Sequence, residues 1–166
     1  KPFADHDIIL NQIAFAEQHG AIAVGIDIDH IAGTNGKYDV VDGYPMGPIT
    51  LKDLKTIVEK THLPFVAKGV LSVSDALKAR EAGCKAIVVS HHHGRIPFGI
   101  PPAYALPKIK DALTGSNIKI FADCGIESGY DAYKLLALGA DAVSVGRAIL
   151  SPDRKSTRLN SSHRSL

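Results

Sequence analysis

The sequence has few cysteines, no long apolar segment and no leader-like start. Its two cysteines, Cys84 and Cys124, are too few for a disulfide framework and favour a reducing compartment. No apolar stretch approaches the roughly 20 residues that a membrane-spanning helix needs. The chain starts Lys1-Pro2-Phe3, without an initiator Met or the apolar core of a signal peptide. We therefore expect a cytoplasmic protein that neither spans a membrane nor is secreted.

The chain also lacks the excess of one charge that marks nucleic-acid-binding proteins. Its formal net charge is +2, but residues 151–166 hold four of the 19 basic side chains and one of the 17 acidic ones. The first 150 residues therefore carry 15 basic and 16 acidic side chains. A nearly neutral chain of this kind lacks the basic patch that binds nucleic acid. Its hydrophobic content of 45% is typical of a soluble globular domain.

What the sequence does contain is a series of five short apolar runs, each preceded by a helical pattern. Three of the runs follow a glycine of the kind that ends helices, namely Gly20, Gly83 and Gly139. Two helical patterns begin with capping-box spacing, at Thr50 and at Ser72. Apolar runs of this length indicate strands that are buried on both faces. The five runs are residues 21–28, 63–67, 85–90, 118–122 and 141–145.

The order of these patterns predicts an α/β fold. Helix and strand patterns alternate, which gives a parallel sheet covered by helices, either open or closed as a barrel. Five strands are too few for an eight-stranded barrel, so a (β/α)8 TIM-barrel fold would be present as a fragment of about five βα units. Residues 153–166 are rich in Ser and Arg and have no periodicity. We interpret them as a non-native or disordered tail, which leaves residues 1–152 as the partial barrel.

Polar and ionisable residues follow every one of the five runs. In parallel α/β folds, ligands bind at the carboxyl ends of the strands, so these residues predict a site on one rim. Charges that are merely solvated at strand ends are the alternative. The residues are Asp27, Asp29 and His30 after the first run, Lys68 after the second, Ser90 to Arg95 after the third, Asp123 to Gly125 after the fourth, and Gly146 and Arg147 after the fifth.

Several of these segments resemble the family of FMN-dependent α-hydroxy-acid oxidases and dehydrogenases, which includes glycolate and lactate oxidases. The resemblance covers about residues 5–150 and implies strands four to eight of that family's barrel, with FMN as cofactor. The matching segments are Pro64-Phe65-Val66-Ala67-Lys68-Gly69-Val70, Ser90 through Arg95, Phe121-Ala122-Asp123-Cys124-Gly125-Ile126 and Val145-Gly146-Arg147.

The family signature after its sixth strand is Ser-Asn-His-Gly-x-Arg, and the chain keeps Ser90, His92 and Arg95 at this spacing. The resemblance implies that His92 is the catalytic base and that Arg95 binds the substrate carboxylate, for which a planar fork of donors is well suited. Strand alternation also groups Ser90 with His92 on one face, and His91 with His93 on the other. A metal site at the three histidines is the alternative, but no Cys or carboxylate cluster adjoins them.

The remaining roles come from the resemblance. Asp27 matches the aspartate that accepts a hydrogen bond from the catalytic His, with a loop cap as its alternative role. Lys68 matches the lysine near flavin N1 and O2, where a cation would stabilise the reduced ring. The cofactor-binding residues implied are Lys68, Ser90, Asp123, Gly125, Gly146 and Arg147, the last four in the ribityl and phosphate loops.

The sequence departs from the family pattern at four places. Gly25 stands where the family usually has Thr, and Glu127 stands where it has a phosphate-binding Arg. Residues 28–36 contain no Arg or Lys, so the second arginine that holds the substrate carboxylate is missing. Residues 39–47 are foreign to the best-known members. These departures predict a divergent subgroup with another substrate.

We therefore expect an FMN-dependent oxidoreductase that converts a small 2-hydroxy acid, similar to lactate or glycolate, into the 2-oxo acid. We expect no nucleic-acid, membrane or metal partner, and a homo-oligomer when the protein is full length. A type 2 isopentenyl-diphosphate isomerase is the alternative enzyme, although the Ser-x-His-x-x-Arg spacing speaks against it. An inactive truncated fragment is the alternative that is not an enzyme.

Overall fold

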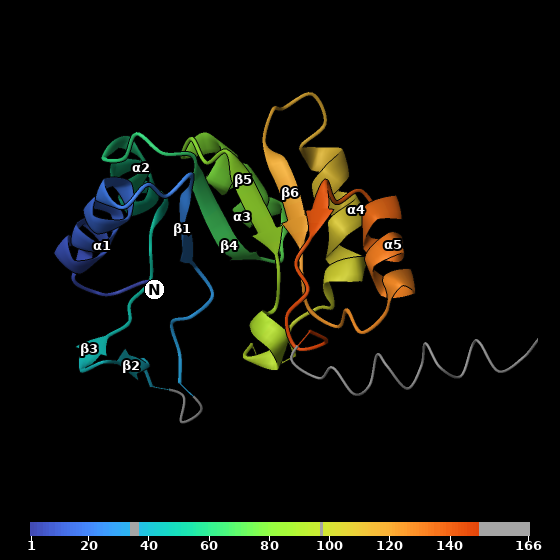
Figure 1. The fold of residues 1–166 in the computed structure, drawn as a ribbon, viewed down its shortest axis with the longest axis horizontal. Helices are drawn as coiled ribbons and strands as arrows, with labels where there is room; N and C mark the ends of the chain where they lie inside the picture. The colour runs from blue at the N-terminus through green and yellow to red at the C-terminus, as the bar shows by residue number, and fades with distance from the viewer. Residues whose placement is uncertain (34–36, 97, 150–166) are drawn as a thin grey trace, which may run out of the picture.

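The computed structural model describes residues 1–33, 37–96 and 98–149 of the chain. Its centre is a five-stranded parallel sheet whose strands lie side by side in chain order (Figure 1). This order confirms the predicted single parallel sheet. The strands are β1 (Val24–Asp27), β4 (Phe65–Val70), β5 (Ala86–Val89), β6 (Lys119–Ala122) and β7 (Ala142–Val143).

Five helices alternate with these strands. They are α1 (His6–Gln18), α2 (Leu51–Glu59), α3 (Val73–Glu81), α4 (Pro102–Ala112) and α5 (Gly129–Ala137). Right-handed crossovers between strands that follow one another in order place all the connecting helices on one face of the sheet. Helices α2, α3, α4 and α5 accordingly pack against one another in sequence along the sheet (Figure 1). No helix in the described ranges is long and apolar enough to cross a membrane.

Side-chain hydroxyls fix the starts of three helices. Thr50, Ser72 and Ser128 each accept a hydrogen bond from the backbone N–H three residues later. In α2 and α5 the residue at that third position is an aspartate, Asp53 or Asp131. Its carboxylate accepts a hydrogen bond from the backbone N–H of the cap residue, which completes a capping box. Two of these caps, at Thr50 and Ser72, are those predicted from the sequence.

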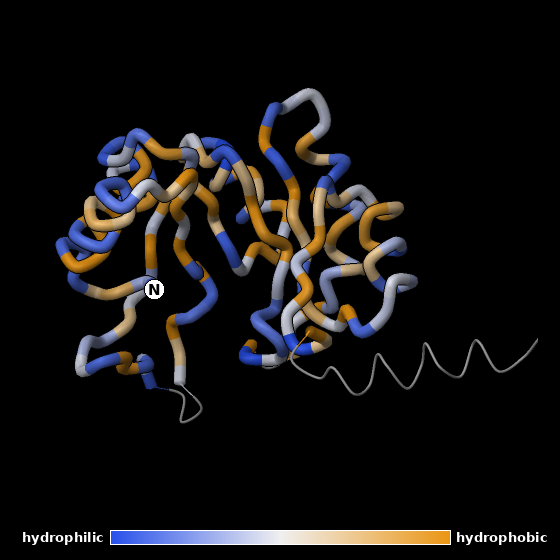
Figure 2. The backbone as a smooth tube through the Cα atoms, viewed as in Figure 1, coloured by the Kyte–Doolittle hydropathy of each residue, from blue (hydrophilic) through white to orange (hydrophobic). Residues whose placement is uncertain are grey.

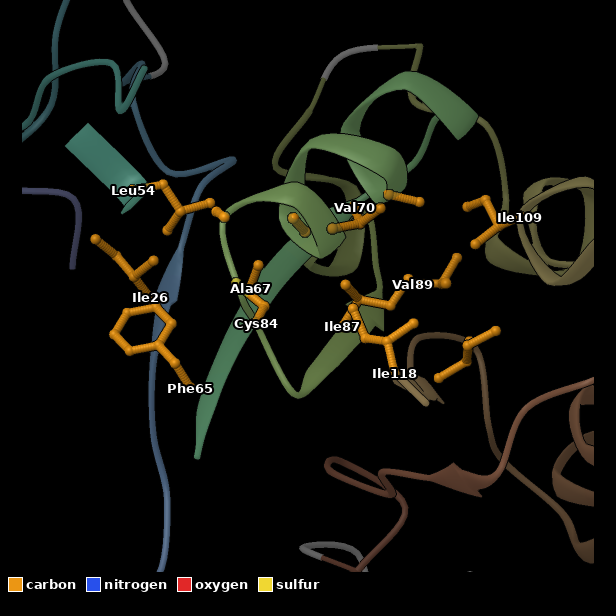
Figure 3. Close-up of a cluster of buried hydrophobic side chains, with 14 of the residues drawn as sticks. Ile26, Leu54, Phe65, Ala67, Val70, Cys84, Ile87, Val89, Ile109 and Ile118 are labelled. Atoms are coloured by element: carbon orange, nitrogen blue, oxygen red, sulfur yellow. The ribbon is translucent and has the colours of Figure 1, made fainter. Parts of the chain in front are cut away.

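The core lies between the sheet and its helices. Alternate strand residues, such as Phe65 and Ala67 in β4, are fully buried against the helical layer, while the residues between them are only partly buried. Figure 3 shows Ile87 and Val89 of β5 on the same side, with Ile109 of α4 facing them. Burial raises the pKa of the Cys84 thiol to about 11, so this cysteine is a packing residue. One face of the sheet is thus buried by the helices, and ligands of such folds bind at the carboxyl ends of the strands.

The connection after β1 forms secondary structure of its own, for which we made no prediction. It contains an antiparallel hairpin of β2 (Val40–Val41) and β3 (Tyr44–Pro45). The two turn residues, Asp42 and Gly43, have positive φ angles of 53° and 84°, as an Asp-Gly hairpin turn requires. A short 3-10 turn, η1 (His92–Gly94), follows β5. The interpreted tail, residues 153–166, lies outside the described residues.

The packing of β5 generates a stability prediction. Ile87 is fully buried at the centre of the sheet, whereas Ile22 is 89% exposed. We expect Ile87→Ala to lower the free energy of unfolding by about 2–5 kcal/mol, because the substitution removes buried methyl groups and leaves a cavity. Urea denaturation followed by circular dichroism measures the difference. Ile22→Ala is the matched control and should change stability by less than about 0.5 kcal/mol.

Candidate active site

The carboxyl ends of the strands bring the predicted rim residues together. Asp27 and Lys68 are register partners at the ends of β1 and β4. The Nζ atom of Lys68 lies 3.3 Å from Oδ1 of Asp27 and 3.8 Å from Oδ2 of Asp123, which follows β6. Figure 2 shows that the chain becomes hydrophilic just beyond these strand ends. Three strands therefore contribute to one charged cluster.

Asp27 is the most strongly stabilised anion of this cluster. Its second oxygen, Oδ2, accepts a hydrogen bond of 2.9 Å from the ammonium group of Lys1. Burial alone would raise the pKa of Asp27, but the hydrogen bond from Lys1 and the charge of Lys68 outweigh it and lower the pKa to about 2. Asp27 is therefore ionised throughout the neutral range, with both oxygens facing ammonium groups.

Two aspartates lie near His92. We expected Asp27 within hydrogen-bond reach of His92 or within about one water of it, and a carboxylate oxygen of Asp27 lies within 4.8 Å of a ring nitrogen of His92. The carboxylate in direct contact is that of Asp29, with 3.3 Å between Nδ1 of His92 and Oδ1 of Asp29. The side chain of Asp29 is 2% exposed. Asp27 turns toward Lys1 and Lys68 instead, because their charges hold it at the end of β1.

Gly69 makes the position of Asp29 possible. Its φ angle is +94°, and a Cβ atom at this residue would lie 2.3 Å from Cγ of Asp29. A side chain at position 69 would therefore displace the carboxylate that contacts His92. Gly69 belongs to the segment Pro64 to Val70 that resembles the family, but the segment alone does not indicate this packing role.

The three histidines leave the strand in a turn. Because His92 and His93 both have positive φ angles, of 52° and 55°, the predicted strand alternation ends before them and does not decide where they point. The backbone N–H of His92 donates to Oγ of the fully buried Ser90, at 3.0 Å. Nδ1 of His91 accepts from the N–H of Gly94, at 2.8 Å, which closes the turn. His92 is thus the histidine aimed at β1, and His91 supports the turn.

Arg95 contacts two residues, Asp39 and His30, to which we assigned no role from the sequence. Its NH1 group donates to Oδ2 of Asp39, at 3.0 Å, and also contacts Nε2 of His30. Asp39 lies in the segment that we described as foreign to the family. His30 follows β1 and was noted only as one of several rim residues. A carboxylate and an imidazole thus surround the predicted carboxylate-binding arginine.

His30 connects this pair to His92. Its side chain is 3% exposed, its Nε2 lies 2.7 Å from Oδ2 of Asp39, and its ring stands edge-on to that of His92 with 5.5 Å between centroids. Burial, partly offset by the hydrogen bond with Asp39, lowers the pKa of His30 below its usual value. Among the described residues, the buried side-chain atoms without a hydrogen-bond partner are Nδ1 of His30 and Oδ2 of Asp29. Both belong to this cluster.

The ion pairs around the cluster disfavour a metal ion. Asp27, His30 and His92 each place one potential ligand atom within 4.8 Å of the others, a spacing that a metal ion could use. However, Asp27 already forms ion pairs with Lys1 and Lys68, and the guanidinium of Arg95 contacts His30. These cations lie where a metal ion would have to approach, and they oppose it.

The loops after β6 and β7 form a second, more open part of the rim. Cys124 and Gly125 have successive positive φ angles of 70° and 71°, and a Cβ atom at Gly125 or Gly146 would meet nothing within 4 Å. Arg147 is exposed and has no ion pair within the described ranges. Glu127 is exposed as well. Open glycines beside an unpaired arginine suit a phosphate group.

Comparison with known proteins identifies the family. The model of the FMN-dependent dehydrogenases matches residues 29–152, which is most of the 166-residue chain. The chain belongs to the FMN-dependent dehydrogenase family.

Relatives in this family are longer than the chain. L-lactate dehydrogenase of Pseudomonas entomophila (strain L48) is 48% identical over 103 residues, which are 61% of this chain and 27% of the relative. A mandelate oxidase variant with (S)-mandelic acid superimposes with a TM-score of 0.78 at 31% identity, covering 89% of this chain and 48% of the other. A variant with a monooxide FMN adduct gives 0.73 at 34% identity, covering 87% and 46%. The sheet therefore corresponds to part of a barrel, which confirms the fold class.

The rim fits the FMN that this family uses. Gly125, Gly146 and Arg147 would hold the phosphate, since two open backbone loops and an unpaired cation face that part of the rim. Lys68 and Asp123 would lie at the ring and the ribityl chain. A Cβ atom at Gly25 would lie 2.5 Å from the Val66 carbonyl oxygen, so strand packing does not admit a larger residue there. Because Asp29 contacts His92, the residue two positions before that aspartate is Asp27, which pairs with Lys68. Glu127, where the resemblance implies a phosphate-binding Arg, is exposed.

The low pKa of Asp27 generates a pH prediction. Because its folded pKa of about 2 lies below the ordinary value of 3.8, ionised Asp27 stabilises the fold above about pH 4, and this contribution disappears as the pH falls toward 2. We expect Asp27→Asn to lower the free energy of unfolding by about 1–2 kcal/mol at pH 6 and by much less at pH 2, where much of Asp27 is protonated. Urea denaturation at the two pH values measures this. Asp111→Asn, which changes an exposed acid in α4, should show no such pH dependence.

Proposed function

We propose that the chain forms part of an FMN-dependent enzyme that oxidises a small 2-hydroxy acid to the 2-oxo acid. The observation that carries the proposal is the placement of a base and a carboxylate-binding group in one cluster: His92 and Arg95 both contact His30. The named relatives act on lactate or mandelate, which are both 2-hydroxy acids. The cytoplasmic location and the homo-oligomeric state of the full-length protein belong to this proposal and rest on the sequence alone.

Arg95 binds and orients the substrate. Its NH1 group is held by Asp39, while no hydrogen bond within the described residues uses Nε or NH2. These two donors form a flat edge that matches the two oxygens of a carboxylate. The carboxylate of a 2-hydroxy acid bound there brings the neighbouring hydroxyl carbon toward His92.

His92 accepts the proton that the substrate loses. Its contact with Asp29 fixes the orientation of the ring, and the negative charge stabilises the imidazolium that forms. Bound FMN supplies the acceptor for the two electrons. Lys68 supplies a positive charge at the same rim, held in place between Asp27 and Asp123.

Substitution of His92 tests the proposed base. In the FMN-loaded full-length protein, we expect His92→Gln to slow flavin reduction by a 2-hydroxy acid about 10²–10⁴-fold while flavin stays bound, because a positioned base contributes that much. Anaerobic stopped-flow spectroscopy measures the reduction. His93→Gln is the matched control, since His93 is exposed and adjacent, and it should reduce at nearly the wild-type rate. Equal rates for wild type and His92→Gln would overturn the mechanism.

Substitution of Arg147 tests the cofactor site. We expect Arg147→Ala to lower the fraction of protein that carries FMN, with an increase in the dissociation constant of about tenfold, because a charge facing the phosphate is lost. The absorbance ratio of flavin to protein, measured after dialysis, reports occupancy. Arg80→Ala, at an exposed position in α3, is the control for charge alone. Unchanged occupancy in Arg147→Ala would contradict the assigned phosphate loop.

A further inference from the structure

One carboxylate joins three separate segments at the candidate site. Oδ2 of Asp39, just before β2, lies 3.0 Å from NH1 of Arg95 and 2.7 Å from Nε2 of His30. Arg95 follows η1, and His30 follows β1. Figure 1 shows the β2–β3 hairpin and η1 at the same end of the sheet. Asp39 thus reaches across this end from a segment that the sequence analysis regarded as foreign to the family.

The backbone holds Asp39 firmly. Its N–H donates to the carbonyl oxygen of Ile31 at 2.9 Å, and its own carbonyl oxygen accepts from Met46 at 2.8 Å. Its other carboxylate oxygen accepts from the N–H of Val40 at 3.0 Å. Met46 is fully buried and forms a bridge with Phe3. The hairpin therefore presents a carboxylate whose position is set by the core.

Arg95, by contrast, has a long and half-exposed side chain with many rotamers of its own. A guanidinium that samples many orientations pays an entropic cost when it binds a carboxylate, and an anchor on one nitrogen reduces that cost. Asp39 engages NH1 and leaves the edge of Nε and NH2 without a hydrogen bond among the described residues. Asp39 therefore contacts the guanidinium of Arg95 on the side away from the edge formed by Nε and NH2.

We propose that Asp39 is a positioning residue, which holds Arg95 so that its free edge faces the substrate carboxylate. The proposal rests on the proposed function and extends it to a segment outside the motifs that carry the family resemblance. His30 takes part because its Nε2 shares the same carboxylate oxygen, which fixes its buried ring against His92. The hydrogen bond from His30 also keeps the pKa of Asp39 below its usual value, so the anchor stays charged at neutral pH.

A double-mutant cycle tests whether Asp39 acts through Arg95. The probe is oxalate, whose binding to the FMN-loaded protein is measured by titration calorimetry. We expect Asp39→Asn to weaken oxalate binding about tenfold, because the charged anchor of the guanidinium is lost. In an Arg95→Lys background the same change should alter binding by less than twofold, since an ammonium group has no edge to orient. Turnover of a 2-hydroxy acid should show a raised KM with kcat within about threefold.

Two further variants separate positioning from folding. Asp42→Asn changes an exposed acid in the turn of the same hairpin and should leave oxalate binding unchanged. Asp39→Glu keeps the charge and should bind oxalate within about threefold of wild type. Additive effects of Asp39→Asn and Arg95→Lys, or a Glu variant as weak as the Asn variant, would overturn the proposal.

The outcomes also distinguish this proposal from the proposed function. If oxalate binds with the expected coupling but no 2-hydroxy acid reduces the flavin, the positioning role of Asp39 stands and the proposed oxidation fails. If the wild-type protein binds no oxalate, the carboxylate site does not exist and the positioning role fails with it. If 2-hydroxy acids reduce the flavin but the cycle is additive, the positioning role alone fails.

Discussion

Parallel pairing of the strands in chain order is the constraint on which the site depends. Because β1, β4, β5 and β6 run side by side in the same direction, the residues that follow them meet at one edge of the sheet. Lys68 can therefore lie within ion-pair distance of both Asp27 and Asp123, although these residues are far apart in the sequence. A different strand order would leave the same charges on separate parts of the surface.

Three cationic or basic groups at this edge each lie against a different carboxylate. Lys68 lies near Asp27, His92 contacts Asp29, and Arg95 contacts Asp39. A partially buried cation without such a partner would be costly, and a free carboxylate would repel an acidic substrate. The pairing lets several charged groups share a small volume, while Nε and NH2 of Arg95 make no hydrogen bond among the described residues and remain for an anion.

The fold and the outline of the site could be predicted because the signals are local. Capping residues such as Thr50 and Ser72 and the apolar runs act within a few residues, so they mark the helices and the sheet. The hairpin at residues 40–45 also carries a local signal, the Asp42-Gly43 pair, which the sequence analysis did not use. The turn at His92 carries none that strand alternation could detect, because positive φ angles at histidine are set by the surrounding contacts.

The sequence by itself determined an α/β chain with a parallel sheet, and a rim containing Lys68, His92, Arg95 and Asp123. Only the tertiary structure decided that Asp29 contacts His92, that Asp39 contacts Arg95 and that Asp27 forms ion pairs with Lys1 and Lys68. Asp29 and His92 are 63 residues apart, and their contact requires the space that Gly69 leaves between β1 and β5. Residue type and spacing along one strand do not encode such a contact, because the choice between Asp27 and Asp29 depends on charges and packing contributed by other strands.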